Sequence, residues 1–186
     1  NKDISLYLGP NFHFVIYPIN QNNEFNFISI IRKELIEAEI SNRDLFNDKT
    51  FTNNLLNKIS SKSNLNLTEI VKEVKCFPIF VSKKIQIPKY KNIFLTGDAF
   101  FSFPPSLAQG ASQSIEAANE LFYDLKDNSS NYYKTRVLKT KQINSRSSIN
   151  HFAFHLTNSI NIFFRNLFLK YLSKNKNFLE NYLGKI

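Results

Sequence analysis

Apolar and polar positions along the chain predict a hairpin first and helices after it. Two runs rich in β-branched and aromatic residues, 12–18 and 25–31, are joined by the polar residues 20–24, a pattern typical of a β-hairpin. From residue 41 to 74 the apolar spacing becomes helical, with Ser41 and Thr68 as the expected N-caps. Prolines then bound a stretch, 79–87, that we expect to be extended.

The second half of the chain predicts one strand and two helices. The apolar run Ile93-Phe94-Leu95, within residues 90–96, fits a buried strand that stops at Gly97-Asp98. Beyond Pro104-Pro105, apolar residues recur every three or four positions, as on one face of a helix: Ala111, Ile115, Ala118, Phe122 and Leu125. The polar residues 127–131 end that helix. A second stripe predicts one long final helix through Ile149, Phe152, Leu156, Ile160, Phe163, Leu167 and Tyr171.

Composition narrows the class of protein. A chain of 186 residues with 42% apolar and 21% charged residues is not a disordered tail, a collagen-like fibre or a coiled coil. The single cysteine, Cys76, allows neither an intrachain disulfide nor a CxxC metal site, which favours a reducing cytoplasm. There is no methionine, so we expect a processed start or an internal fragment of a longer protein.

The net charge of +9 raises the question of an anionic partner. Asparagine, phenylalanine, lysine and isoleucine are abundant, as the codons of an AT-rich genome favour, and the basic residues are scattered along the chain. Nucleic-acid binding is therefore not expected. The first twenty residues lack the basic and apolar parts of a signal peptide, and polar residues interrupt the most apolar stretch, 149–172. We expect a cytoplasmic protein.

Residues that could form a ligand-binding turn are concentrated in one segment. Two of the four glycines and two of the six prolines lie within residues 97–110. Asp98 follows the predicted strand, and a carboxylate at the carboxyl edge of a sheet can accept hydrogen bonds from sugar hydroxyls. Gly110 opens the next helix, whose unpaired N–H groups and dipole favour negative charge on a ligand. A tight strand-to-helix connection without a ligand is the alternative interpretation.

Residues 97–118, GDAFFSFPPSLAQGASQSIEAA, resemble a motif of a known family. They are similar to the second flavin-binding motif, GDAAHxxxPxxGQGxNxAxEDA, of the class A FAD-dependent aromatic hydroxylases, the group of salicylate and p-hydroxybenzoate hydroxylases. Residues 12–18 and 26–29 resemble the hairpin of that family's substrate domain, in which a Tyr-Pro pair, here Tyr17-Pro18, leads into a second strand. The phenylalanine-rich helix after Arg136 stands where the family has its C-terminal helix.

The resemblance implies a fold and an activity. The fold is a mixed α/β (α+β) chain, the C-terminal part of a p-hydroxybenzoate hydroxylase-like FAD-binding fold. Residues 1–88 would end an antiparallel substrate-binding domain, and residues 89–186 would end the FAD-binding domain with a long terminal helix. The implied activity is that of an FAD-dependent monooxygenase, which hydroxylates an aromatic or quinone-precursor substrate with NADH or NADPH and O2.

The resemblance also implies site residues. Asp98 would hold the ribityl or ribose hydroxyls of FAD, and Pro105 would lie beside the isoalloxazine ring. The full set of implied cofactor-binding residues is Gly97, Asp98, Pro105, Ala108, Gln109, Gly110 and Ala111. Tyr17 and His13 are the candidate substrate residues, although a solvent-facing strand position is the favoured interpretation of His13. No catalytic residue and no oligomeric state is predicted.

The chain departs from the family pattern. Phe101, Ala108, Ser112 and Ala117 replace its histidine, glycine, asparagine and aspartate. We expect Ala108 to cost little, whereas the lost polar residues weaken the inference of hydroxylation. The family's N-terminal GxGxxG fingerprint is absent, so the chain resembles the C-terminal half and should bind FAD poorly by itself.

Other interpretations stay open. An FAD-dependent reductase or an inactive relative would have the same fold, and a basic membrane- or nucleic-acid-binding module could carry the same Gly-Asp turn. Basic residues near the end of the final helix, Arg165, Lys170, Lys174 and Lys176, also suit a peripheral contact with anionic lipid, although packing against the flavin domain is expected. His151 and His155 lie four residues apart, but without a third ligand they predict no metal site.

Overall fold

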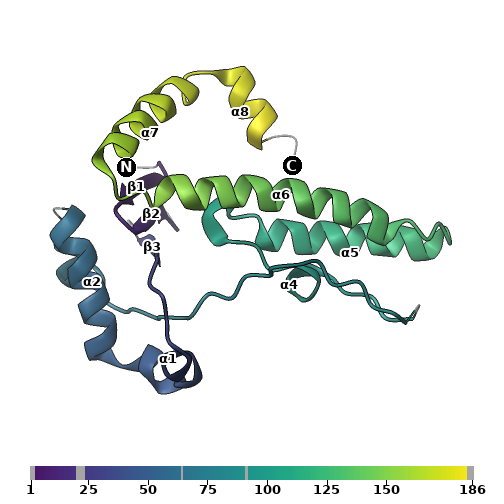
Figure 1. The fold of residues 1–186 in the computed structure, drawn as a ribbon, viewed down its shortest axis with the longest axis horizontal. Helices are drawn as coiled ribbons and strands as arrows, with labels where there is room; N and C mark the ends of the chain where they lie inside the picture. Colours follow the sequence, from purple (N-terminus) through teal and green to yellow (C-terminus); the bar gives the residue numbers. More distant parts are fainter. Residues whose placement is uncertain (1–2, 20–23, 64, 91, 184–186) are drawn as a thin grey trace. The chain divides into compact units, whose positions relative to one another are not determined.

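The structure is a computed structural model that describes residues 3–19, 24–63, 65–90 and 92–183. The chain is mixed α/β and mainly helical, with one three-stranded antiparallel sheet in the described part (Figure 1). It divides into two compact units, Asn1–Pro78 with Ala153–Phe163 and Ile79–Phe152 with Phe164–Ile186. The expected domains, 1–88 and 89–186, were contiguous, whereas here a late segment joins the N-terminal unit.

The sheet of the first unit contains the predicted hairpin. Strand β2 (Phe12–Pro18) pairs with β3 (Phe25–Ile31), which confirms the two runs, while most of the polar link at 20–24 lies outside the described residues. Strand β1 (Ser5–Gly9) pairs with the other edge of β2 and was not predicted. Its turn depends on Gly9, because a Cβ there would lie 2.2 Å from the Phe12 ring.

One face of the sheet packs against helix α2 (Lys49–Ser63). Alternate residues of β2 point to this face, where Phe12 and Phe14 are buried with three residues of the helical segment: Leu56, Ile59 and Leu67. Tyr7 stacks on Phe14 with ring centroids 4.5 Å apart. This cluster is the hydrophobic core of the first unit.

The predicted N-caps of this region are wrong. Ser41 ends the short helix α1 (Glu37–Ser41), and Asn42 caps the following 3-10 turn, η1 (Arg43–Asn47), by accepting from the N–H groups of Asp44 and Leu45. Asp48 accepts from the first N–H groups of α2. Thr68 lies inside α3 (Leu67–Ile70), which is shorter than the segment expected up to Cys76.

The second unit is built on two long helices that lie side by side, α5 (Gly110–Lys126) and α6 (Tyr132–Phe154) (Figure 1). Helix α5 and the polar break after it confirm the prediction. Asp124 fixes this break because its carboxylate accepts from the N–H groups of Asn131 and Tyr132 at 2.6 and 3.1 Å. Two short elements precede α5, namely α4 (Gly97–Phe100) and the 3-10 turn η2 (Pro105–Leu107).

The buried strand predicted at 90–96 is not formed. No strand is assigned there among the described residues, and Ile93 is 44% exposed. Tyrosine hydroxyls take the place of a neighbouring strand: Tyr132 donates to the Leu95 carbonyl, and the Leu95 N–H donates to Tyr133. A strand needs a second backbone beside it, and the described residues offer only side chains here.

The predicted long final helix is two helices. Helix α6 begins well before residue 149 and ends at Phe154, and α7 (Ser159–Leu172) follows a break at which Asn158 accepts from the N–H groups of Ile160 and Asn161. A last helix, α8 (Lys176–Leu183), comes after α7. None of the described helices combines the length and the apolar character needed to cross a bilayer.

Candidate ligand-binding turn at the start of helix α5

Gly97 is required by the chain's own packing. Its φ of +55° lies in the left-handed region, which favours glycine. A Cβ at this position would lie 2.6 Å from the Ser114 Oγ and 3.2 Å from the Ser114 Cβ. The Ser114 hydroxyl in turn donates to the Gly110 carbonyl at 2.9 Å. The glycine therefore lets the Gly-Asp turn approach the first turns of α5.

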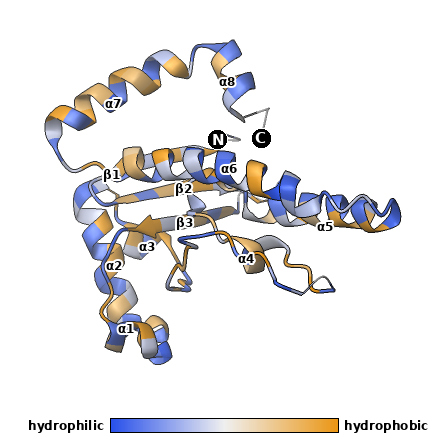
Figure 2. Cartoon of the chain, turned by 45° about the vertical axis from the view of Figure 1, so that its right-hand side comes forward, coloured by the Kyte–Doolittle hydropathy of each residue, from blue (hydrophilic) through white to orange (hydrophobic). Residues whose placement is uncertain are grey.

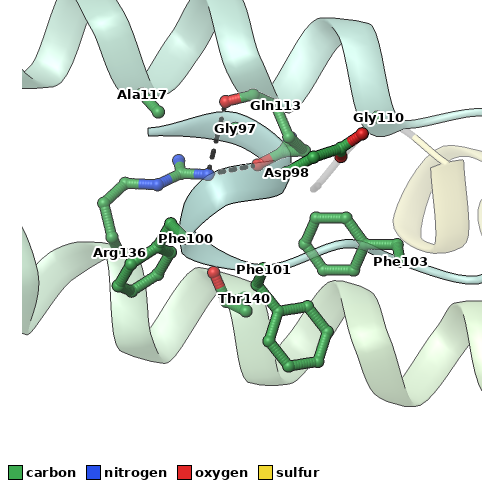
Figure 3. A pocket seen from close by; sticks show the side chains of 10 residues that line it. All are labelled: Gly97, Asp98, Phe100, Phe101, Phe103, Gly110, Gln113, Ala117, Arg136 and Thr140. Carbon is green, nitrogen blue, oxygen red and sulfur yellow. Dashed lines mark hydrogen bonds between the residues drawn. The ribbon is translucent and has the colours of Figure 1, made fainter. Parts of the chain in front are cut away.

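Asp98 follows in the first turn of α4, and its side chain is exposed. Figure 3 shows the carboxylate directed to the side of the turn where Gly110 begins α5. Within the described part of the chain, no hydrogen bond or ion pair satisfies this carboxylate. The side chain therefore does not point into packed interior, and it is free to accept hydrogen bonds from outside.

The N-terminus of α5 is open beside it. Gln109 is the N-cap residue but makes no side-chain capping bond, and the first turn carries no acidic residue. Ala111 and Ser112 are exposed, and a Cβ added at Gly110 would meet no atom within 4 Å. Unlike Gly97, Gly110 is not required by packing within the described residues. The first N–H groups of the helix, which have no side-chain cap, and the helix dipole favour a negatively charged or electron-rich ligand here.

The segment between these two features contains a strained residue. Ala108 ends η2 with φ +54° and ψ +30°, the left-handed conformation. An L-residue with a side chain pays about 1–2 kcal/mol for that conformation. The expectation that alanine costs little at this position is therefore wrong.

Two further residues of the expected cofactor-binding set lie on the same segment. Pro105 is exposed at the start of η2, and Gln109 is half-buried.

A buried layer supports the turn from behind. The Arg136 side chain is only 3% exposed, and its guanidinium donates to the Gln113 Oε1 at 2.9 Å and to a Glu120 carboxylate oxygen at 3.2 Å. Lys139 completes an ion-pair network with Glu116 and Glu120. Burial is the largest single influence on Glu116 and opposes its charge, but the bond from Lys139, the charges of Lys139 and Arg136 and a bond from Gln113 together lower the pKa of Glu116. The network ties α5 to α6.

The turn encloses only a small cavity. It has a volume of about 10 Å³, room for about one water molecule. Its walls come from the turn and from both long helices (Figure 3): Gly97, Asp98, Phe100, Phe101, Phe103, Gly110, Gln113, Ala117, Arg136 and Thr140. Arg136 Nε and Thr140 Oγ1 are buried without a hydrogen-bond partner in the described part. A ring system does not fit inside, so a larger ligand would contact the exposed side of the turn.

The candidate substrate residues lie on β2, in the first unit. Tyr17 is half-buried, and its hydroxyl accepts from the Asn26 side chain at 2.6 Å. The favoured solvent-facing interpretation of His13 is wrong, because this residue is only 3% exposed. Its ring packs edge-on against Phe154 and bonds to His155. Burial against protein rings leaves His13 little surface for a substrate.

The histidines of the i, i+4 pair have different partners. His155 lies beyond the end of α6 and bonds to His13, while His151 Nδ1 lies 3.2 Å from the Ser106 hydroxyl. Among the residues with a described position, no group of three or more His, Cys, Asp or Glu could hold a metal. The sequence likewise predicts no metal site at this pair, because it offers no third ligand near the two histidines.

Sequence reasoning did not find the buried layer behind the turn. Tyr132, Arg136, Thr140, Ile143 and Ser147 are the buried residues of α6, and they recur at intervals of three or four. Because three of them are polar, an apolar stripe does not reveal this face. A helix-spaced arginine opposite the glutamates of a neighbouring helix is the signal that could have indicated it.

No family model, curated protein or solved structure matches this chain.

Proposed function

We propose that this chain is part of an FAD-dependent monooxygenase and that its Gly97–Asp98 turn and α5 N-terminus bind the cofactor. The substrate would be an aromatic compound or a quinone precursor, oxidised with NADH or NADPH and O2. One observation carries the proposal: the exposed, unsatisfied carboxylate of Asp98 lies beside an uncapped helix N-terminus at which Gly110 leaves open space. This pairs an acceptor for hydroxyls with donors for an electron-rich ring edge.

The residues present fit the polar middle of such a cofactor. Asp98 would accept hydrogen bonds from ribityl or ribose hydroxyls. The N–H groups at Gly110 and Ala111 would stabilise negative charge at the edge of the ring, where the helix dipole adds to their effect. Pro105 is exposed on the same segment and would offer an apolar surface to the ring. FAD, when bound, supplies the redox chemistry with the nicotinamide and O2.

The proposed cofactor site requires residues beyond those of this turn. The four glycines, at positions 9, 97, 110 and 184, form no glycine-rich phosphate-binding turn. The described turn encloses a space for one water, not for a ring. The binding site for the pyrophosphate and the second wall of the ring site would therefore have to come from chain outside residues 1–186 or from another polypeptide.

An FAD-dependent reductase or an inactive relative is the second candidate. Phe101 and Ala117, which replace polar residues of the family motif, are 4% and 2% exposed. They pack inside the second unit instead of presenting polar groups to a substrate. Flavin binding is thus better supported than any particular flavin reaction.

The test is the flavin content of the protein expressed from its complete gene. The purified protein should be yellow, and Asp98→Ala should lower the ratio of bound flavin to protein by about tenfold or more, as expected when a charge-assisted hydrogen-bond acceptor is lost. Asp127→Ala is the matched control, because Asp127 is also exposed and lies at the other end of α5. Full occupancy in Asp98→Ala, or a colourless native protein, would overturn the proposal. Hydroxylated product from the flavin-loaded protein would distinguish a monooxygenase from a reductase.

A further inference from the structure

Helix α7 exposes a continuous apolar face. Six large side chains of this helix are between 58% and 68% exposed, and they recur at i, i+3, i+4, i+7, i+8 and i+11: Ile160, Phe163, Phe164, Leu167, Phe168 and Tyr171. This spacing places all six on one side of the helix. Patches of this kind on a protein surface mark sites of interaction with a partner or a membrane.

The helix has a second side that is less exposed. Ile162 and Leu169 are half-buried, and they lie on the side of the helix opposite the exposed six. Figure 2 shows hydrophobic residues along most of α7. Helix α7 is therefore more apolar than one packing face requires, and no residue of α7 is fully buried.

The segment of the sequence that contains α7 has basic residues and no acidic ones. Residues 128–179 contain nine lysines and arginines and no aspartate or glutamate, whereas the rest of the chain has 15 basic and 15 acidic residues. The net charge of these 52 positions thus equals the +9 of the whole sequence. Five of the nine basic residues lie on α6, where Arg136 and Lys139 pair with glutamates of α5, and the other four, Arg165, Lys170, Lys174 and Lys176, lie on α7 or just after it. Lys170, Lys174 and Lys176 are exposed on α7 and just after it.

We propose that α7 is a membrane-surface helix that binds bilayers containing anionic lipid. Its apolar face would enter the boundary between headgroups and acyl chains, while the neighbouring lysines would contact lipid phosphates. With 14 residues the helix is too short to span a bilayer, which takes about 20 apolar residues. The helix would lie in the plane of the surface.

Charge and the apolar face together favour anionic lipid over two other partners, a second copy of the chain and a nucleic acid. A second copy of the chain docked on the same face would bring two acid-free, positively charged segments together, which is unfavourable. A nucleic acid would satisfy the lysines but would leave most of the six apolar side chains in water. Anionic lipid complements both the charge and the apolar face.

The test is co-sedimentation of the chain with vesicles. We expect binding to phosphatidylglycerol vesicles, at least about tenfold weaker binding to phosphatidylcholine vesicles, and a loss of binding as salt is raised. Leu167→Asn with Phe168→Asn should lower the affinity for the anionic vesicles by about tenfold or more. The matched control is Ile115→Asn with Phe122→Asn, since these side chains are 73% and 60% exposed on α5. Circular dichroism of both double variants checks that they remain folded.

Each other outcome counts against the proposal. Equal losses in the α7 variant and the α5 control would show non-specific adsorption. Failure of the native chain to bind anionic vesicles would overturn the proposal, and a dimer lost in the α7 variant would assign the face to a second copy. Salt-sensitive binding to single-stranded DNA that is unchanged in the α7 variant would assign the charge to nucleic acid. These measurements need no flavin, so their result is independent of the cofactor proposal.

Discussion

His13 and His155, 142 residues apart in the chain, are bonded through their ring nitrogens, with Nδ1 of His13 3.1 Å from Nε2 of His155. Both residues are at most 3% exposed. His13 belongs to β2, and His155 belongs to the segment Ala153–Phe163 that completes the same unit. The bond therefore connects the late segment to the sheet.

Replacing either histidine should destabilise the chain. His13→Leu or His155→Leu removes one ring of a buried hydrogen bond, and we expect each to lower the free energy of unfolding by about 1–3 kcal/mol. The double variant should cost less than the sum of the single variants, because both remove the same bond. Urea unfolding of the four proteins measures this coupling. Strictly additive costs would show that the two rings do not stabilise each other.

Two glycines of the candidate site should respond in opposite ways to alanine. Gly97→Ala places a Cβ against Ser114 and forces a left-handed alanine, so we expect a loss of about 1–3 kcal/mol in thermal or urea unfolding. Gly110→Ala meets open space in a helix and should be neutral or should stabilise by up to about 1 kcal/mol. A destabilised Gly110→Ala would mean that the glycine serves the fold and not a ligand.

Ala108 should favour glycine. Ala108→Gly relieves the left-handed strain but makes the unfolded chain more flexible, so the expected gain in the free energy of unfolding is at most about 1 kcal/mol. Ala108→Val should be destabilising, because β-branched side chains tolerate positive φ least. Ala111→Val, at an exposed position in the first turn of α5, is the control for the added bulk. If Ala108→Val and Ala111→Val lower the free energy of unfolding equally, the backbone at Ala108 is not strained.

The Glu116–Lys139 pair should make stability depend on pH at both extremes. Burial is the largest single influence on Glu116 and opposes its charge, but Lys139, Arg136 and Gln113 together lower the pKa of this carboxyl. The stabilisation is therefore present above the ordinary glutamate pKa and is lost as pH falls through the lowered one. Burial also opposes the charge of Lys139, yet its bonds to Glu116 and Glu120 raise its pKa. Its stabilisation is present below the ordinary lysine pKa and is lost as pH rises through the raised one.

The measurement for this pair is the free energy of unfolding against pH, by urea unfolding, for the native chain and for Glu116→Gln. The variant should lose stability at neutral pH and should lose less than the native chain does on acidification. Glu69→Gln is a control, because Glu69 is an exposed residue of α3 outside the network. Parallel pH profiles for the native chain and Glu116→Gln would show that the pair contributes nothing.

Local patterns predicted the elements whose residues interact mainly with their neighbours in sequence. The runs of β-branched and aromatic residues at 12–18 and 25–31 predict the β2–β3 hairpin, and the three- and four-residue spacing after Gly110 predicts α5. Gly97, Asp98 and Gly110 also line the same small cavity, and they lie within 14 consecutive residues of the chain. These features depend on distances of a few residues, which periodicity reports directly.

Contacts between residues far apart in the sequence determined the features that local patterns did not predict. The apolar run Ile93-Phe94-Leu95 is not a strand, because tyrosine hydroxyls of α6 bond to its backbone and no strand among the described residues pairs with it. Arg136 is buried because glutamates and a glutamine of α5 surround it, and His13 is buried because a residue 142 positions away reaches it. A strand, a buried charge and a histidine pair each need a partner from elsewhere in the chain, and only the tertiary structure determines where that partner lies.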